Sequence, residues 1–192
     1  AYLRENADLI AQKLKAKNIT VSTTIMVYPA AKAQDIDLPV YLKTIELAYV
    51  NPGILEGSIF NPGWLPGSNR YEDLDNTDAE GLRKANIYWY TYTEAVHIMT
   101  RALVRNGVRL TAGTDAGNTG IVPGFSLHVE LAQLAEVGLS NAEVLRSATL
   151  AASEWLGSQA GAMEAGRRAD LLLLDSNPLE DIKHTKSIHA VM

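Results

Sequence analysis

Asp115 is the residue of this 192-residue chain that is best placed to do chemistry, in the segment Gly113-Thr114-Asp115-Ala116-Gly117. An aspartate carboxylate can bind a hard divalent cation and can also accept a proton from water. The flanking glycines have no side chain and would let a ligand approach the backbone closely. An aspartate after a strand can equally well cap a helix or close a turn. Residue type and spacing alone leave both roles open.

The elements around Asp115 must bring it to a usable place. Residues 108–112 predict a short strand directly before it, and residues 79–106 predict a long helix that ends at Gly107. Residues 19–27 are rich in β-branched side chains and predict an earlier strand. The order strand, helix, strand, helix is typical of parallel βα units, whose chemistry lies beyond the carboxyl ends of the strands. Asp115 occupies such a position.

The rest of the chain divides into three stretches. Residues 2–17 predict an amphipathic helix, and residues 28–78, which hold most of the prolines, predict a long loop with one short helix at 40–49. After the expected helix at 127–138, Ser140 and Glu143 have the spacing of a capping box, and a further helix runs to Gly157. Strands are expected at 169–175 and 187–191.

The composition excludes several classes of function. The chain has 17 Lys and Arg against 22 Asp and Glu, a net charge of −5, and no basic cluster, which argues against nucleic acid as a partner. Its longest aliphatic run, Leu171–Leu174, is far too short for a membrane helix. The absence of cysteine excludes disulfides, thiolate metal sites and a cysteine nucleophile. No compartment is predicted.

Three segments resemble one known family. GVRLTAGTDAG (107–117), LHVELAQLAEVGLSNAEVLRSATLAAS (127–153) and GAMEAGRRADLLLLDSNPLEDI (161–182) are similar, in this order, to the carboxyl-terminal part of the metal-dependent amidohydrolase superfamily, in its imidazolonepropionase-like and prolidase-like branch. The resemblance implies an α/β fold: the carboxyl-terminal part of a (β/α)₈ TIM barrel in residues 1–160, followed by the start of a small β-sandwich in residues 161–192.

The resemblance also implies a metal site. One or two divalent ions, zinc being the ion expected, would lie at the carboxyl mouth of the barrel. The family's ligands are a His-x-His pair on the first strand, histidines on the fifth and sixth strands, and an aspartate on the eighth. Only the aspartate maps onto this chain, as Asp115, which would be both metal ligand and catalytic residue. The four histidines contain no His-x-His pair.

The implied function is hydrolysis of a carbon–nitrogen bond in an amide, peptide or cyclic amide by a metal-activated water. A deaminase acting on a small ring belongs to the same class. The chain opens within an expected helix without an initiator methionine and ends on an expected strand. We therefore expect a segment of a longer enzyme that is inactive alone. The alternative is a non-catalytic amidohydrolase-like module for assembly or binding. The expected partner is a small amide or peptide, without nucleic acid or membrane; a homo-oligomer is left open.

Other residues are weaker candidates, each with a plainer alternative. His128, on the helix after Asp115, could bind substrate or simply pack, and Glu130 follows it with a weaker claim. Glu94 and His97 have a metal-bundle spacing but no evident partner helices. The remaining candidates are expected to be solvated or to pack: His184 and His189, the aromatic set Trp64, Tyr88, Trp89, Tyr90 and Tyr92, and the acidic segment 69–78, which lacks the pattern of a calcium loop.

Overall fold

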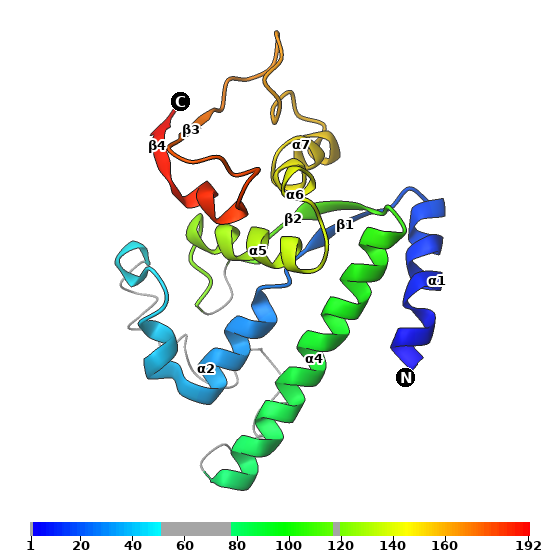
Figure 1. Ribbon diagram of the computed structural model, residues 1–192, viewed down its shortest axis with the longest axis vertical. Helices are drawn as coiled ribbons and strands as arrows, with labels where there is room; N and C mark the ends of the chain where they lie inside the picture. Colours follow the sequence, from blue (N-terminus) through cyan, green and yellow to red (C-terminus); the bar gives the residue numbers. More distant parts are fainter. Residues whose placement is uncertain (1, 51–77, 117–119) are drawn as a thin grey trace.

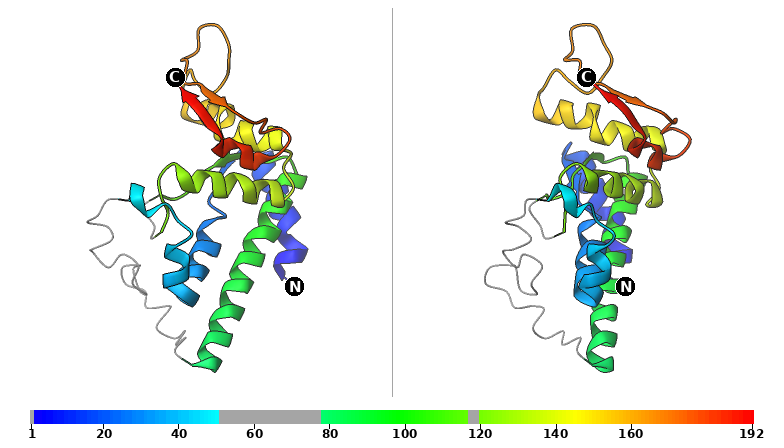
Figure 2. Two further views of the ribbon diagram at one scale, coloured as in Figure 1. Left: turned by 60° about the vertical axis from the view of Figure 1, so that its left-hand side comes forward. Right: turned by 90° about the vertical axis from the view of Figure 1, so that its left-hand side faces the viewer.

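The computed structural model describes residues 2–50, 78–116 and 120–192 (Figures 1 and 2). Its elements are α1 (Tyr2–Ala16), β1 (Thr20–Thr23), α2 (Val27–Leu42), η1 (Leu47–Tyr49), α4 (Ala79–Arg105), β2 (Arg109–Ala112), α5 (Phe125–Glu136), α6 (Asn141–Ala148), α7 (Leu150–Leu156), β3 (Leu172–Leu174), η2 (Ile182–Lys186) and β4 (Ile188–Val191). Helical segments precede, separate and follow the strands β1 and β2, as in an α/β fold.

The strands β1 and β2 pair in parallel, with Thr20 opposite Arg109 and Thr23 opposite Ala112. This confirms the parallel arrangement that the order of elements predicted. Because both strands end in the same register, the chain leaves both of them at one edge. The segment that carries Asp115 and the turn after β1 therefore begin side by side.

Two helices pack against one another and against these strands. Figure 1 shows α1 running beside the carboxyl-terminal half of α4. Their shared core includes Ala7 and Ala11 from α1 and Ala102 and Leu103 from α4, and Leu110 of β2 joins it. Asp78 caps α4, because its side chain accepts a hydrogen bond from the Gly81 N–H at 2.7 Å.

The helices after β2 build a second core. Leu131 and Leu134 of α5, Val144 of α6 and Ile182 of η2 pack together with Ile25. The predicted capping box at the start of α6 is present, with the Ser140 and Glu143 side chains each accepting from the other residue's backbone N–H. Gly157 ends α7 in the left-handed conformation. This core places α5 against the turn that follows β1.

The expected loop over residues 28–78 is wrong in its first part, because residues 27–42 form α2. The two prolines of this segment are compatible with helix, because α2 consists of two helical stretches that meet at a kink. Pro29 lies in the first turn, where a helix needs no N–H donor. At Asp37 the backbone leaves the helical region (φ −156°, ψ 81°), and its carboxylate accepts from the Val40 N–H at 3.0 Å. Pro39 thus again falls in a first turn. The helix expected at 40–49 is reduced to the end of α2 and η1; residues 51–77 lie outside the described residues.

The strands are shorter than predicted. The strand expected at 19–27 ends at Thr23, and Ile25 and Met26 are buried in a turn instead, because the only partner strand in the described part of the chain, β2, also ends there. The strands expected at 169–175 and 187–191 are β3 and β4, an antiparallel pair with an irregularity between Leu173 and Leu174. The β-sandwich and the boundary near residue 160 stay predictions. None of the described helices combines the length and apolar composition that a bilayer crossing needs.

Candidate functional site

The carboxyl ends of β1 and β2 are joined by two hydrogen bonds. The Gly113 N–H donates to the Thr23 carbonyl at 2.9 Å, and the buried Thr23 hydroxyl donates to the Thr111 carbonyl at 3.3 Å. Glycine is required at position 113, because a Cβ atom there would lie 2.9 Å from both the Ser22 Oγ and the Thr23 carbonyl oxygen. These contacts fix the direction in which the chain leaves β2 toward Asp115.

Asp115 lies three residues beyond the end of β2, and it is exposed. Its φ of 54° lies in the left-handed region, which among the described non-glycine residues only Asn18 shares. Aspartate tolerates this conformation better than most residues, yet it is still an uncommon one that occurs often at functional sites. The backbone geometry therefore singles out the residue that the sequence selected.

Gly120, which follows Asp115 in the chain, is held by α2. The Tyr41 hydroxyl, at the end of α2, donates to the Gly120 carbonyl at 2.9 Å. A Cβ at Gly120 would lie 2.6 Å from the Tyr41 ring. Burial raises the pKa of Tyr41 to about 12, so the hydroxyl keeps its proton and remains a donor. We call residues 113–116 the Asp115 loop; Gly113 within it is held by β1, and Gly120 beyond it is held by α2.

His128 faces η2. Its Nδ1 atom lies 2.9 Å from the Thr185 hydroxyl, which itself donates to the Ile182 carbonyl at 2.8 Å. Because the Thr185 proton is engaged, we infer that His128 Nδ1 carries a hydrogen and donates. Burial lowers the pKa of His128, and the positive charge of Lys186 lowers it further. These contacts give His128 a packing role between α5 and η2; substrate binding by its ring stays a prediction.

Glu130 is the residue whose importance the sequence reading underestimated. Its side chain is 0% exposed, and one carboxylate oxygen, Oε2, accepts from the Met26 N–H at 2.9 Å. Burial raises the pKa of Glu130, and the hydrogen bond from the Met26 N–H offsets only part of that rise. A signal was available: Leu127, Leu131 and Leu134 define the buried face of the helix, and position 130 falls on that face.

The weaker candidates have structural partners. Glu94 pairs with Arg4 at 2.7 Å, and His97 Nε2 lies 3.4 Å from the Gln133 side-chain oxygen. His184 Nδ1 lies 2.8 Å from the Asn177 carbonyl oxygen, and His189 Nδ1 lies 2.9 Å from Asp175. These interactions agree with the plainer alternatives for each. Trp64 and residues 69–77 lie outside the described residues.

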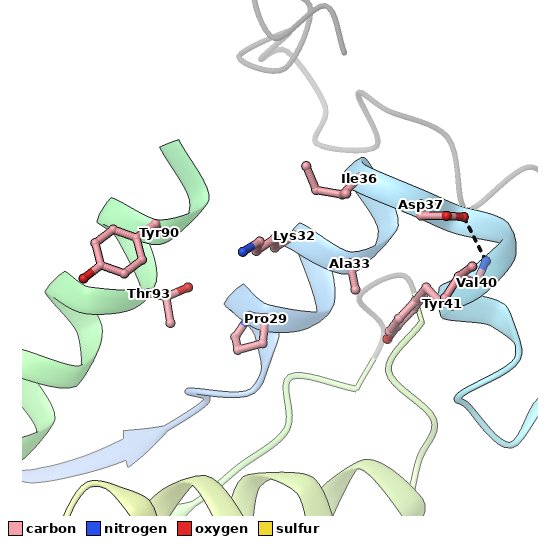
Figure 3. A pocket seen from close by; sticks show the side chains of 9 residues that line it. All are labelled: Pro29, Lys32, Ala33, Ile36, Asp37, Val40, Tyr41, Tyr90 and Thr93. Carbon is pink, nitrogen blue, oxygen red and sulfur yellow. Dashed lines mark hydrogen bonds between the residues drawn. The ribbon is translucent and has the colours of Figure 1, made fainter. Parts of the chain in front are cut away.

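The aromatic residues of α4 pack against one another and against α2. Trp89 is buried and meets the Tyr88 ring edge-on at 5.2 Å, while the Tyr92 ring stacks with Tyr28 of α2 at 6.1 Å. A largely apolar cavity of about 390 Å³ lies between the two helices. Figure 3 shows Lys32 and Asp37 on its α2 side and Tyr90 on its α4 side. Most of the aromatic set therefore packs, and Tyr90 alone among its described members lines this cavity.

Asp115 fits a divalent cation by ligand type, because a carboxylate oxygen is a hard, anionic donor. Residues 2–50, 78–116 and 120–192 contain no group of three or more His, Asp or Glu side chains that could hold a metal ion. Protein metal sites of the catalytic kind usually have three protein ligands. Asp115 would therefore supply one ligand of a larger set.

Comparison with known proteins identifies relatives of this arrangement. The family model described as the amidohydrolase family matches residues 72–192. No curated protein matches the chain in sequence. A putative prolidase from Bifidobacterium longum is 29% identical over 63% of this chain and 29% of its own, with a TM-score of 0.51.

Two further solved structures share the fold over nearly the whole chain. The A. niger ochratoxinase is 19% identical, with a TM-score of 0.59 over 95% of this chain and 32% of its own. A prolidase complexed with N-methylphosphonate-L-proline is 22% identical, with a TM-score of 0.55 over 96% of this chain and 36% of its own. The chain thus spans about a third of the length of these solved structures.

Proposed function

Because the chain belongs to the amidohydrolase family, we propose that the protein carrying it hydrolyses a carbon–nitrogen bond of an amide, peptide or cyclic amide. The observation that supports this proposal is the placement of Asp115. It follows a parallel strand at the carboxyl edge, it is exposed, and its backbone is left-handed. In barrel enzymes, residues at this edge carry the chemistry.

Asp115 has two tasks in this proposal. Its carboxylate would bind a divalent cation, zinc being the ion that the family resemblance implies, with one or two ions in the complete protein. The other ligands would come from the part of the family fold that this chain does not span. A bound divalent ion lowers the pKa of water toward neutrality and polarises a carbonyl.

The second task is proton transfer. Asp115 would accept a proton from the attacking water while the water oxygen forms a bond to the carbonyl carbon. It would then return that proton to the nitrogen as the carbon–nitrogen bond breaks. The left-handed backbone and the anchors at Gly113 and Gly120 would hold the carboxylate in place for both transfers.

The test is Asp115→Asn in the complete protein. The substitution keeps the shape but removes the charge and the ability to accept and return a proton, so turnover should fall by about 10²- to 10⁴-fold while the melting temperature changes little. The assay is zinc-supplemented hydrolysis of a panel that contains a proline-ending dipeptide, an N-acyl amino acid and a five-membered cyclic amide. Asp170→Asn, an exposed aspartate in the carboxyl-terminal part of the chain, is the matched control and should leave turnover unchanged.

The results separate this proposal from a non-catalytic module. Turnover of Asp115→Asn within a few-fold of the unaltered protein would remove Asp115 from catalysis. If the unaltered protein hydrolyses no member of the panel at any zinc concentration, the hydrolase proposal fails, and an amidohydrolase-like module for assembly or binding becomes the better account.

A further inference from the structure

Glu130 is a carboxyl group placed where carboxyl groups are seldom found. It lies on α5 with its side chain 0% exposed, packed among the residues that bury the apolar face of that helix. Its Oε1 atom has no hydrogen-bond partner among the described residues. An apolar residue would fill this space without the cost of burying a polar group. A polar group in such a place therefore calls for a specific reason.

The reason lies at the start of α2. The Glu130 Oε2 accepts from the Met26 N–H, and Met26 is the residue directly before the helix, whose own side chain makes no cap. The first N–H groups of a helix have no partner within it, and an oxygen of a side chain placed near them can accept their hydrogen bonds. Glu130 thus supplies, from a helix about a hundred residues later, the cap that the local sequence lacks.

The same contact reaches the Asp115 loop through β1. Thr23, three residues before Met26, accepts the hydrogen bond from the Gly113 N–H, and Gly113 precedes Asp115 by two residues. The turn between Thr23 and Met26 is therefore fixed at one end by the Asp115 loop and at the other by Glu130. A shift of this turn would move the hydrogen-bond acceptor of Gly113.

We propose that Glu130 is a positioning residue: its buried carboxylate holds the turn after β1 against α5 and thereby fixes the backbone that presents Asp115. This inference rests on the proposed function for its effect on turnover. The claim that Glu130 fixes the backbone at Met26 and Gly113 does not depend on that function. Glu130 itself touches no substrate in this proposal and acts through the hydrogen bond to Met26.

Two substitutions separate the hydrogen bond from the packing. Glu130→Gln keeps an oxygen that accepts from Met26 but leaves its own NH₂ group without a partner. Glu130→Met fills a similar volume, removes the acceptor and leaves the Met26 N–H without a partner. Each variant therefore buries one unpaired donor, and we expect their melting temperatures to lie close together. Glu136→Gln and Glu136→Met, at an exposed glutamate of the same helix, are the matched controls.

Amide hydrogen exchange by NMR is the first measurement. In Glu130→Met, the Met26 amide should exchange about tenfold faster or more, and the Gly113 amide should also exchange faster, while Glu130→Gln should keep both within about threefold of the unaltered protein. The Glu136 pair should change neither amide. Equal protection of Met26 in the Met and Gln variants would overturn the proposal, and so would a Gly113 amide that does not respond.

Turnover in the complete protein is the second measurement. Glu130→Met should lose about tenfold or more because small displacements of a catalytic group are costly, and Glu130→Gln should recover most of that loss. A merely structural role would predict similar turnover for two variants of similar stability. If the unaltered protein hydrolyses nothing, the proposed function fails. The amide exchange then still decides whether Glu130 holds the turn after β1 and the backbone at Gly113.

Discussion

Two pairs of short strands lie in the described part of the chain, and they differ in the direction of their pairing and in their burial. The strand-end region, by which we mean β1, β2 and the turns that follow them, is covered by helices, and side chains such as Thr23, Ile25 and Thr111 are buried there. The tail, by which we mean β3 and β4, is exposed along both strands, with Leu172 59% and Leu173 60% accessible. The strands of each pair are joined by backbone hydrogen bonds, but only the first pair is packed.

This difference shows what fixes a site. Backbone pairing sets the direction of a strand, but the position of a residue beyond its end depends on what packs around that end. The strand-end region has the Gly113 contact, the Tyr41 anchor and the buried Glu130. The tail has hydrogen bonds to exposed partners, such as the His189–Asp175 pair. Stability and function should therefore respond to substitution in the first region far more than in the second.

The largest effect on stability should come from Leu134→Ala. Leu134 is 0% exposed in the core that supports α5 against the strand-end region. Removing a buried leucine side chain leaves a cavity and typically costs about 2–5 kcal/mol in the free energy of unfolding. Urea denaturation of the variant and the unaltered protein measures the loss. A loss below about 1 kcal/mol would mean that this core is not the support of the strand-end region.

Gly113→Ala should have the next largest effect, and it should affect activity as well. The added methyl would overlap the Ser22 Oγ and the Thr23 carbonyl, each 2.9 Å from the Cβ position, and overpacking typically costs about 1–3 kcal/mol. Ser22→Ala removes one of these two contacts, so the double variant should recover part of the loss in a denaturation experiment. The backbone carbonyl cannot be removed in this way. Full recovery of the free energy of unfolding by Ser22→Ala would show that the contact with the Thr23 carbonyl oxygen costs nothing.

The sequence predicted much of this region because local rules and packing agree there. The strand before Asp115, the helix that ends at Gly107 and the capping box of Ser140 and Glu143 all appear as expected. Asp115 could be selected because the order of elements places it at the strand edge. The family resemblance is confirmed by the match over residues 72–192.

What the sequence did not predict depends on contacts between distant residues. The prolines within α2 suggested a loop. A proline is compatible with the first turn of a helix, and the side chain of Asp37, which accepts from the Val40 N–H, starts such a turn at Pro39. Glu130 was underestimated because its partner, the Met26 N–H, lies 104 positions earlier in the chain. The roles of Asp115 in binding metal and of His128 in binding substrate stay predictions.

The smallest effect should come from Leu173→Ala in the tail, which makes the same chemical change as Leu134→Ala. Leu173 is paired through its backbone with Ala190, and that pairing does not depend on the side chain. Because the side chain is 60% exposed, its removal takes little apolar surface out of a packed environment, and the free energy of unfolding should change by no more than about 0.5 kcal/mol. Urea denaturation beside Leu134→Ala compares the two regions directly. A loss at Leu173 approaching that at Leu134 would mean that the tail is packed in solution, and the contrast between a packed site and an unpacked tail would then no longer hold.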